Sequence, residues 1–500
     1  RNYPSCNIIC TLTTFSQVFR LDPTRFYVSV QMKPCCLKGG PMSDTSAKLV
    51  IRNIGMILSG KMEVPIFDGD CLIAHDGKIS AWGYEKDMDC EAATTEVDAH
   101  GATLAPGLID SHVHPVVGDY TPRQQQLGWI DSTLHGGVTT LISAGEVHMP
   151  GRPKDIVGLK AMAIASQRWY ENFRPSGVKV HAGAPVIEHG MVEEDFAEMA
   201  KAGVTLLGEV GLGTVKDGKT AAQMVGWARK YGMQSTIHTG GPSIPGSGLI
   251  DADMVLETGT DVVGHINGGH TALPDDQIIC LCEGCKAALE IVHNGNERAA
   301  LLTLNTAREL GKLDQLILGP DGPAGSGVQP LGIMRMVAML SSLGDVPAEI
   351  AFCFGNGNTA RQRKLDTGLI EIGKCADFVL MDQAQHAPGK NMLESVQLGN
   401  LPGVGMTVID GVVRSLRSRN TPPATRLPEL VVGTFCGLIK AIGFFPSLHG
   451  KKGFHYHYIH VQFSPRRGGR VLRSNLARLK PVKCQLAEHR SIKRYWQFEF

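Results

Sequence analysis

Short apolar runs recur along the middle of the chain at near-regular intervals, and this recurrence constrains the fold more than any other feature. Eight of them have the composition of buried strands, at residues 104–109, 137–142, 178–182, 204–207, 234–237, 261–263, 288–292 and 316–318. Stretches with helical periodicity separate most of them, for example residues 193–202 and 221–231. Strands that alternate with helices pair in parallel, and eight such units close a (β/α)8 barrel. The sequence therefore predicts an α/β fold with a barrel over residues 105–362.

Strand-like sequence without intervening helices flanks the predicted barrel on both sides. Residues 70–77 and 78–82 form a predicted hairpin whose turn contains Asp76 and Gly77, a pair typical of two-residue turns. Strand-like sequence without intervening helices appears again after the barrel, at residues 377–381 and 406–411. We therefore expect a small β-sandwich domain composed of residues 42–104 and 363–427, one segment from each side of the barrel.

The two ends of the chain differ from its middle in charge and in pattern. Residues 451–500 contain 12 lysines and arginines but two acidic residues, and residues 1–41 contain five and one. The whole chain has a net charge of +1, so its middle is acidic. A basic tail can bind nucleic acid, but such tails usually interleave their cations with aromatic or small residues. We predict instead that residues 1–41 are a non-native or disordered flank and that residues 428–500 are a disordered or spurious extension.

Side chains that commonly bind metal ions follow five of the predicted strands. They are His112, His114, Glu209, His238, His265 and Asp321. From Glu209 onward the intervals are 29, 27 and 56 residues, which correspond to one, one and two repeats of the predicted strand-and-helix unit. The carboxyl ends of barrel strands converge on one face, so these side chains should meet there. Four imidazoles and two carboxylates are enough for two divalent ions, and such ligands suit Zn²⁺, Fe²⁺ or Mn²⁺.

Two motifs resemble signatures of the amidohydrolase superfamily. Residues 105–114 read APGLIDSHVH, like the first barrel strand of that superfamily, and residues 368–377 read GLIEIGKCAD, like its return into the β-sandwich. Within the superfamily, residues 42–427 are most similar to the enamidase family. The supporting segments are residues 118–124, 150–155, 208–213, 238–241, 265–269 and 418–423. The resemblance implies a TIM-like barrel of the amidohydrolase type, assembly as a homotetramer and a native chain that begins near Met42.

The resemblance also implies roles for the six candidate ligands. The implied sets are His112, His114 and Asp321 for one ion and His238 and His265 for the other, with Glu209 as the bridge. Many relatives bridge their ions with a carbamylated lysine instead, and the ions of the enamidase family are zinc and iron. The chain departs from the family pattern at Pro320, where Asn is expected before Asp321. Proline restricts the backbone at this point. Of the six candidate ligands, Asp321 is therefore the one whose position the sequence predicts least well.

The reaction that the resemblance implies is hydrolysis of a cyclic enamide, 6-oxo-1,4,5,6-tetrahydronicotinate, to 2-formylglutarate and ammonia in nicotinate breakdown. Asp321 would accept a proton from the attacking water and pass it to the leaving nitrogen. The substrate carboxylate requires a cationic or polar partner, and the candidates in the loops after the first two strands are Arg123, His148, Arg152 and Lys154. A solvated surface position is an equally good reading of each of these four residues.

Two rival functions are compatible with the same fold. Another binuclear cyclic-amide hydrolase or deaminase of the superfamily would share the six ligands and differ in its pocket, because the fold does not determine the substrate. A scaffold protein that has lost catalysis would lack metal ligands, whereas all six are present in this chain. The presence of all six candidate ligands therefore argues against a scaffold protein without catalysis.

Cysteine usage and hydropathy indicate where such a chain would work. Residues 42–427 contain seven cysteines without regular spacing, which is typical of free thiols in a reducing compartment. The most apolar late segment, residues 430–448, contains Lys440 and Pro446 and is a poor membrane span. We therefore expect a cytoplasmic enzyme whose partner is a small cyclic amide, with neither nucleic acid nor membrane as a partner.

Overall fold

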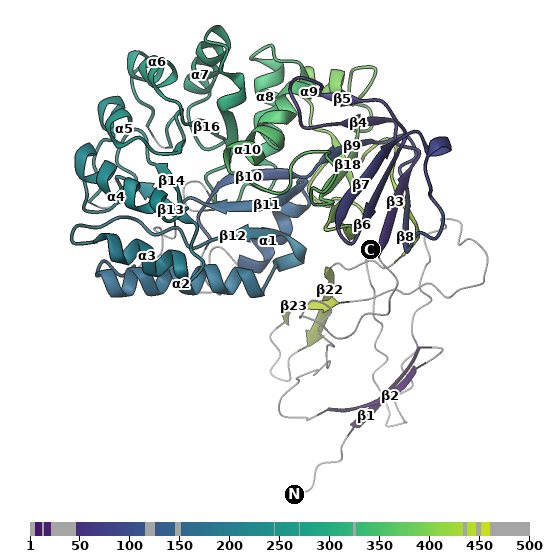
Figure 1. Ribbon diagram of the computed structural model, residues 1–500. Helices are drawn as coiled ribbons and strands as arrows, with labels where there is room; N and C mark the ends of the chain where they lie inside the picture. Colours follow the sequence, from purple (N-terminus) through teal and green to yellow (C-terminus); the bar gives the residue numbers. More distant parts are fainter. Residues whose placement is uncertain are drawn as a thin grey trace, which may run out of the picture. The chain divides into compact units, whose positions relative to one another are not determined.

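Parallel strands alternate with helices through the middle of the chain (Figure 1). The computed structural model describes residues 6–12, 15–21, 47–115, 126–145, 152–244, 246–269, 271–323, 327–433, 438–446 and 452–460. Within these ranges the eight predicted strand positions all carry parallel strands. They are β10 (Leu108–Val113), β11 (Val138–Ser143), β12 (Lys179–His181), β13 (Leu206–Val210), β14 (Gln234–Ile237), β15 (Val262–Val263), β16 (Ala288–Val292) and β17 (Leu316–Gly319).

The strands form two sheets that backbone hydrogen bonds join into a closed barrel. One sheet has the order β10-β11-β12 and the other the order β13-β14-β15-β16-β17. The first and last strands meet where His114 N–H donates to Gly322 O at 2.9 Å and Val113 pairs with Gly322 in parallel. The other junction is bridged by Gly208 N–H, which donates to Pro185 O at 2.9 Å. The (β/α)8 barrel predicted from the sequence is confirmed.

Helices follow the barrel strands in the described ranges. They are α1 (Gln126–Leu134), α2 (Ile156–Asn172), α3 (Glu193–Lys201), α4 (Gly218–Lys230), α5 (Ala252–Thr258), α6 (Asp275–Gly284), α7 (Glu297–Glu309), α8 (Gly332–Ser342), α9 (Ala348–Phe354) and α10 (Gly357–Gln362), with short 3₁₀ turns at Pro175–Gly177 and Leu313–Gln315. Asp155, Asp217, Asp251 and Asn296 cap the first turns of α2, α4, α5 and α7. None of the helices described is long and apolar enough to cross a membrane.

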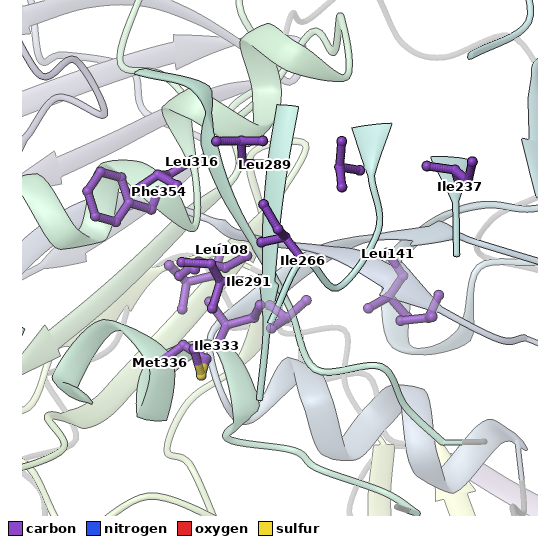
Figure 2. Close-up of a cluster of buried hydrophobic side chains, with 14 of the residues drawn as sticks. Leu108, Leu141, Ile237, Ile266, Leu289, Ile291, Leu316, Ile333, Met336 and Phe354 are labelled. Atoms are coloured by element: carbon purple, nitrogen blue, oxygen red, sulfur yellow. The ribbon is translucent and has the colours of Figure 1, made fainter. Parts of the chain in front are cut away.

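A continuous apolar core fills the space between the strands and the helices (Figure 2). Its buried members include Leu108, Leu289, Ile291 and Leu316 from the strands, Ile333 and Met336 from α8, and Phe354 from α9. Burial of such side chains contributes about 1.5–3 kcal/mol each to the folded state. The core therefore provides a rigid support for the strand ends on which the polar side chains lie.

The first predicted strand requires a correction. The sequence suggested one strand over residues 104–109, but the structure contains two, β9 (Thr103–Pro106) and β10, which belong to different sheets. The break is at Gly107, where an added Cβ atom would lie 2.2 Å from Thr139 Oγ1. The chain leaves the β-domain there and enters the barrel. His112 consequently lies within β10 instead of after it.

The small domain consists of two packed β-sheets whose strands come from both sides of the barrel. One sheet has the order β20-β19-β18-β9-β4-β5 and the other the order β21-β8-β3-β6-β7. Besides β9, the strands are β3 (Lys48–Arg52), β4 (Met56–Leu58), β5 (Ile66–Phe67), β6 (Cys71–His75), β7 (Lys78–Gly83), β8 (Thr95–Asp98), β18 (Phe378–Asp382), β19 (Gly403–Ile409), β20 (Val412–Ser415) and β21 (Glu429–Val432). A 3₁₀ turn (Glu85–Asp87) lies between β7 and β8, whereas the helix α11 (Met392–Gln397), between β18 and β19, packs against α8 and α9 of the barrel.

The core of this domain combines residues from both chain segments. Ile51, Leu72 and Leu104 pack with Phe378 and Met406, and all of them are fully buried. The composite β-sandwich is therefore part of the fold, as the sequence suggested. Strand β21 lies beyond the predicted boundary at residue 427 and pairs antiparallel with β8, so the sheet extends further along the chain than the pattern indicated.

The terminal segments contain two antiparallel hairpins in the described ranges. One joins β1 (Cys6–Leu12) to β2 (Phe15–Leu21), and the other joins β22 (Leu438–Pro446) to β23 (Lys452–His460). The chain divides into a unit that contains these hairpins and a unit that contains Ser46–Gly437. The expectation that residues 1–41 and 428–500 are flanks or extensions remains a prediction.

A buried ion network connects the barrel to the β-sandwich. Lys179 of β12 places Nζ 2.6 Å from Asp377 Oδ2 and 2.7 Å from Asp410 Oδ1. Thr367 Oγ1 donates to the same Asp377 oxygen at 2.7 Å, and Asp410 N–H donates to the other at 2.8 Å. The Asp377 side chain is fully buried. Its carboxylate therefore binds three groups, one from each of three separate segments of the chain.

The variant Asp377→Ala should destabilise the fold by about 3–5 kcal/mol, because it leaves the Lys179 ammonium buried without its main counter-charge. We would measure the free energy of unfolding in urea. The matched control is Asp366→Ala, since Asp366 also pairs with a lysine but its side chain is 61% exposed. The control should change stability by less than about 1 kcal/mol. Equal losses in the two variants would contradict a special role for the buried network.

Candidate metal centre

The first two candidate ligands come from the buried end of β10. His112 lies in the strand, and His114 follows its last residue, so the two imidazoles project from the same side. Both side chains are at most 2% exposed. Their Nε2 atoms lie 3.5 Å and 3.7 Å from the two carboxylate oxygens of Glu209. The strand therefore directs both histidines toward one carboxylate.

Glu209 of β13 is the centre of the cluster. Its Oε1 lies 2.8 Å from His265 Nε2 and 3.3 Å from His238 Nδ1. His238 immediately follows β14, and His265 lies two residues beyond β15. Two groups of potential ligands thus share Glu209, one with His112 and His114 and one with His238 and His265. This is the arrangement of a carboxylate between two cation sites.

Asp321 completes the set despite the prolines around it. Its Oδ1 lies 3.2 Å from His114 Nε2 and 3.7 Å from His112 Nε2. Asp321 N–H donates to His112 O at 3.2 Å, which fixes its backbone to the neighbouring strand. The structure therefore brings all six predicted side chains together, including the one whose approach the sequence defined least.

Two of the six residues have unusual backbone conformations. His265 has a φ of +33° and Asp321 a φ of +60°, in the left-handed region that side chains other than glycine rarely adopt. Such conformations cost about 1–3 kcal/mol each and concentrate at functional sites. Close packing next to them also requires glycine: a Cβ atom added at Gly319 would lie 2.5 Å from that of His112. The backbone around the cluster therefore adopts costly conformations that place the side chains of His265 and Asp321 next to the other candidate ligands.

Hydrogen bonds on the outer side of the cluster orient three of the histidines. His114 Nδ1 lies 2.6 Å from Gly145 O, and His238 Nε2 lies 2.8 Å from Gly241 O. Because a carbonyl accepts, each of these nitrogens carries the proton. The other nitrogen of each ring then faces Glu209, where it could bind a cation held between the two. His112 is oriented in the same way, since its Nδ1 lies 2.5 Å from Glu290 Oε2.

The residues fit divalent metal ions. In the described part of the chain, His112 Nε2 is buried and forms no hydrogen bond of good geometry, although it faces two carboxylates. A buried nitrogen in this condition costs about 1–3 kcal/mol unless a ligand compensates it. Neutral imidazole and carboxylate are the donor types that zinc, iron and manganese prefer. The donor set and the uncompensated nitrogen both indicate cation binding.

The electrostatics of the cluster favour charged carboxylates. Burial alone would raise the pKa of Glu209, but its close contacts with His112, His238 and His265 outweigh burial and hold that pKa well below its usual range. Burial also opposes the charged form of Asp321, yet the bond with His114 and the nearby His112 lower its pKa. Both acids are therefore ionised at neutral pH and available to a cation.

Two buried residues behind the cluster were missed by the sequence reasoning. Glu290 of β16 and Arg363, which follows α10, face each other with 3.4 Å between Oε1 and NH2. Arg363 also donates to Ser111 Oγ and Ser111 O, both at 2.9 Å, and to Thr236 Oγ1 at 3.1 Å. The signal for Glu290 was available, because a lone acid in the run Ala-Leu-Glu-Ile-Val must be buried. Arg363 had no such signal.

The variant Glu290→Gln should weaken metal binding by roughly 10- to 100-fold. The Glu290 carboxylate makes the His112 imidazole a stronger metal ligand, and the variant removes that negative charge. The measurement is the metal content that remains after equilibration with a competing chelator. Glu283→Gln is the matched control, since Glu283 is exposed at the end of α6. Unchanged metal affinity in Glu290→Gln would show that His112 does not depend on this partner.

The four candidate substrate residues differ in their placement. Arg123 and His148 lie outside the described residues, so their roles stay predictions. Lys154 is exposed. Arg152 is buried, and its NH2 lies 2.9 Å from Glu188 Oε1, with exposed fractions of 7% and 3% for the two side chains. Among the candidates that the structure describes, only Arg152 has a constrained side chain.

Comparisons with known proteins agree with this geometry. An enamidase from Eubacterium barkeri is 45% identical over 385 residues, which are 77% of this chain and all of that protein. A crystal structure of enamidase, described as a member of the amidohydrolase superfamily, matches with a TM-score of 0.75 over the same shares of the two chains. A β-aspartyl dipeptidase from Fervidobacterium islandicum shares the fold at 18% identity, with a TM-score of 0.52 over 77% of this chain and all of that one.

No family model matches the chain. The identity to enamidase over its whole length, however, is far above what the fold alone produces, and the catalytic face brings together acids and histidines that could hold divalent ions. The chain is accordingly a metal-dependent hydrolase of carbon–nitrogen bonds, and it belongs to the enamidase family of the amidohydrolase superfamily.

Proposed function

We propose that this protein hydrolyses 6-oxo-1,4,5,6-tetrahydronicotinate to 2-formylglutarate and ammonia, as a step of nicotinate breakdown. The observation that carries the proposal is the 45% identity to an enamidase over that protein's full length. The convergence of four histidines and two acids on the catalytic face supports it, because amide hydrolysis at neutral pH needs an activated water.

We assign the six side chains to two metal ions. His112 and His114 hold one ion together with Asp321, which lies 3.2 Å from His114 Nε2. His238 and His265 would hold the other, and Glu209, which contacts all four histidines, would be shared by both ions. The proposed pair is zinc and iron, following the resemblance to the enamidase family. Divalent ions bound here supply Lewis acidity, which lowers the pKa of a water and polarises an amide carbonyl.

Asp321 carries the proton transfer in this proposal. Its Oδ1 faces His114 and His112, while Asn294 Nδ2 lies 3.5 Å from Oδ2 on the other side. The carboxylate accepts a proton from the attacking water and donates it to the ring nitrogen when the C–N bond breaks. Contacts on both of its oxygens hold the acid in place for both transfers.

The overall reaction consumes two waters. The first opens the lactam and gives a carboxylate and an enamine, in which the former ring nitrogen is a primary amine. The imine tautomer of this enamine then takes up the second water and releases ammonia, which leaves an aldehyde. The products are one 2-formylglutarate and one ammonia per substrate, with no change of oxidation state overall.

Product analysis tests the proposed reaction. We would incubate the metal-loaded full chain with the substrate, quantify ammonia enzymatically and follow the aldehyde by proton NMR. We expect one equivalent of ammonia and one of aldehyde for each substrate consumed. Consumption of substrate without ammonia would contradict the proposed products, and no consumption by the metal-loaded protein would move this enzyme to a different cyclic amide.

We also propose that the enzyme is a homotetramer and works in the cytoplasm. The first proposal follows the resemblance to the enamidase family. The second is supported by the seven cysteines between residues 71 and 375, which are free. Free thiols without disulfide partners are typical of reducing compartments. Size-exclusion chromatography with light scattering would measure the assembly state.

A further inference from the structure

Arg152 is a buried cation with part of its hydrogen-bonding capacity unused. Its side chain is 7% exposed, and NH2 forms an ion pair with Glu188 at 2.9 Å. NH1 is also buried, yet within the described part of the chain it has no hydrogen-bond partner. A guanidinium donor that is removed from water without a partner is costly. This donor is therefore a place where a ligand would be bound favourably.

Glu188 holds the arginine in a fixed position. The acid is buried, and its second oxygen accepts a hydrogen bond from Thr214 N–H at 2.7 Å. Thr214 Oγ1 in turn accepts from His189 N–H at 2.7 Å, so the loops after β12 and β13 are connected by two bonds. Lys216 anchors its ammonium to Gly211 O at 2.9 Å in the same loop. Among the described residues, Lys216 thus adds a second cation to the loop that Glu188 contacts. Burial lowers the pKa of Lys216, and the charge of Glu188 opposes that shift.

These loops belong to the catalytic face. Arg152 lies in the connection from β11 to α2, Glu188 follows β12, and Thr214 follows β13, so all three lie beyond the carboxyl ends of adjacent barrel strands. Glu209, the centre of the metal cluster, is five residues before Thr214 in the chain. Glu209 N–H also donates to Ala144 O, just after β11, at 2.7 Å. The Arg152–Glu188 pair thus lies on the rim around the ligands.

We propose that Arg152, positioned by Glu188, binds the carboxylate of the lactam substrate and thereby selects acidic cyclic amides over neutral ones. The inference rests on the proposed function and specifies its substrate class. In a six-membered lactam with a 3-carboxylate and a 6-oxo group, the carboxylate lies across the ring from the scissile carbonyl. A cation for it must therefore lie away from the metal ligands, as the rim does. The planar guanidinium matches a carboxylate better than an ammonium does.

A pair of saturated lactams tests this assignment without requiring turnover. They are 6-oxopiperidine-3-carboxylate and piperidin-2-one, which differ only in the carboxylate. We would measure the binding of each to the metal-loaded full chain by calorimetry. The wild type should bind the acid roughly 10- to 100-fold more tightly than the neutral lactam. In Arg152→Gln this preference should fall to about threefold or less, while the affinity for piperidin-2-one stays unchanged.

Further variants separate a binding role from a structural one. Arg152→Lys keeps the charge without the planar donor pair and should retain part of the preference. Glu188→Gln should also lower the preference for the acidic lactam, because Arg152 loses its ion-pair partner. With 6-oxo-1,4,5,6-tetrahydronicotinate as substrate, this variant should raise KM more than it lowers kcat. Arg168→Gln is the matched control, since Arg168 is exposed on α2. The control should keep the full preference.

The outcomes distinguish this inference from the proposed function. A preference that persists in Arg152→Gln, or an equal loss of affinity for both lactams, would overturn the role of Arg152 even if the enzyme hydrolyses tetrahydronicotinate. A preference that depends on Arg152 in a protein that does not hydrolyse tetrahydronicotinate would support the carboxylate site and reject the proposed substrate.

Discussion

The variant Asp321→Asn is expected to lower kcat by about 10²–10⁴-fold while the protein retains its fold and at least one metal ion. The carboxamide has nearly the same shape as the carboxylate, but it cannot accept a proton from water or donate one to the leaving nitrogen. Its oxygen can still face His114, which lies 3.2 Å from Oδ1 in the structure. We would measure kcat, KM and bound metal on the same preparation.

The matched control for this experiment is Asp253→Asn, because Asp253 is exposed on α5. Its kcat should equal that of the wild type. Activity above roughly one-tenth of the wild-type value in Asp321→Asn would contradict the proposed proton transfer. Loss of all metal in that variant would mean that its lower kcat reflects lost metal binding, and the proposed proton transfer by Asp321 would then have no support.

The variant Glu209→Ala should abolish activity and reduce the bound metal from two ions to one or none. Glu209 lies within 3.7 Å of a nitrogen of each of the four histidines, so its removal takes an anionic ligand from both proposed sites. It also leaves His238 and His265, with ring centroids 4.5 Å apart, without their shared acceptor. We therefore expect a stability loss of about 3 kcal/mol in metal-free protein.

Two measurements check the Glu209 prediction: elemental analysis of bound metal and urea unfolding in the presence of a chelator. Glu194→Ala is the control, because Glu194 is exposed on α3 and should affect neither quantity. Two tightly bound ions in Glu209→Ala would mean that the histidines and Asp321 suffice. The bridging role assigned to this glutamate would then be wrong.

The sequence predicted the barrel well because its signal is local and repeated. An apolar run of a few residues followed by a histidine or an acid marks a buried strand and its catalytic end, and this pattern recurs at Leu207 with Glu209 and at Ile237 with His238. The intervals between such residues equal whole repeats. That regularity is sufficient to predict which side chains meet, because strand ends in a barrel share one face.

What the sequence could not show depends on contacts between distant segments. The run 104–109 looks like one strand, and only the close approach of Gly107 to Thr139 explains why the chain changes sheets there. Glu290 was visible as an acid in an apolar strand, but its bond to His112 requires the closed barrel. Arg363 lies after a short helix with no pattern of its own. Its contacts with Ser111 and Thr236 exist only because the tertiary fold brings those strands beneath it.

The substrate-binding residues show the same limit. Arg152 and Lys154 are two positions apart and equally cationic, so no local pattern distinguishes them. The structure does, because Arg152 is buried against Glu188 and Lys154 is exposed. The partner, Glu188, lies 36 residues further along the chain and follows a different strand. The residues proposed to select the substrate are therefore set by contacts between different loops, which no local pattern predicts. The candidate metal ligands follow the strand-and-helix repeat and could be predicted from it.

The central claim is that this chain is a metal-dependent hydrolase of a cyclic enamide. The most direct test follows the ultraviolet absorbance of 6-oxo-1,4,5,6-tetrahydronicotinate, whose conjugated enamide is lost when the ring opens. The full chain, loaded with zinc and iron, should remove this absorbance at a rate that falls to background after chelation and returns when metal is restored. An unchanged absorbance with a folded protein that carries two ions would contradict the claim.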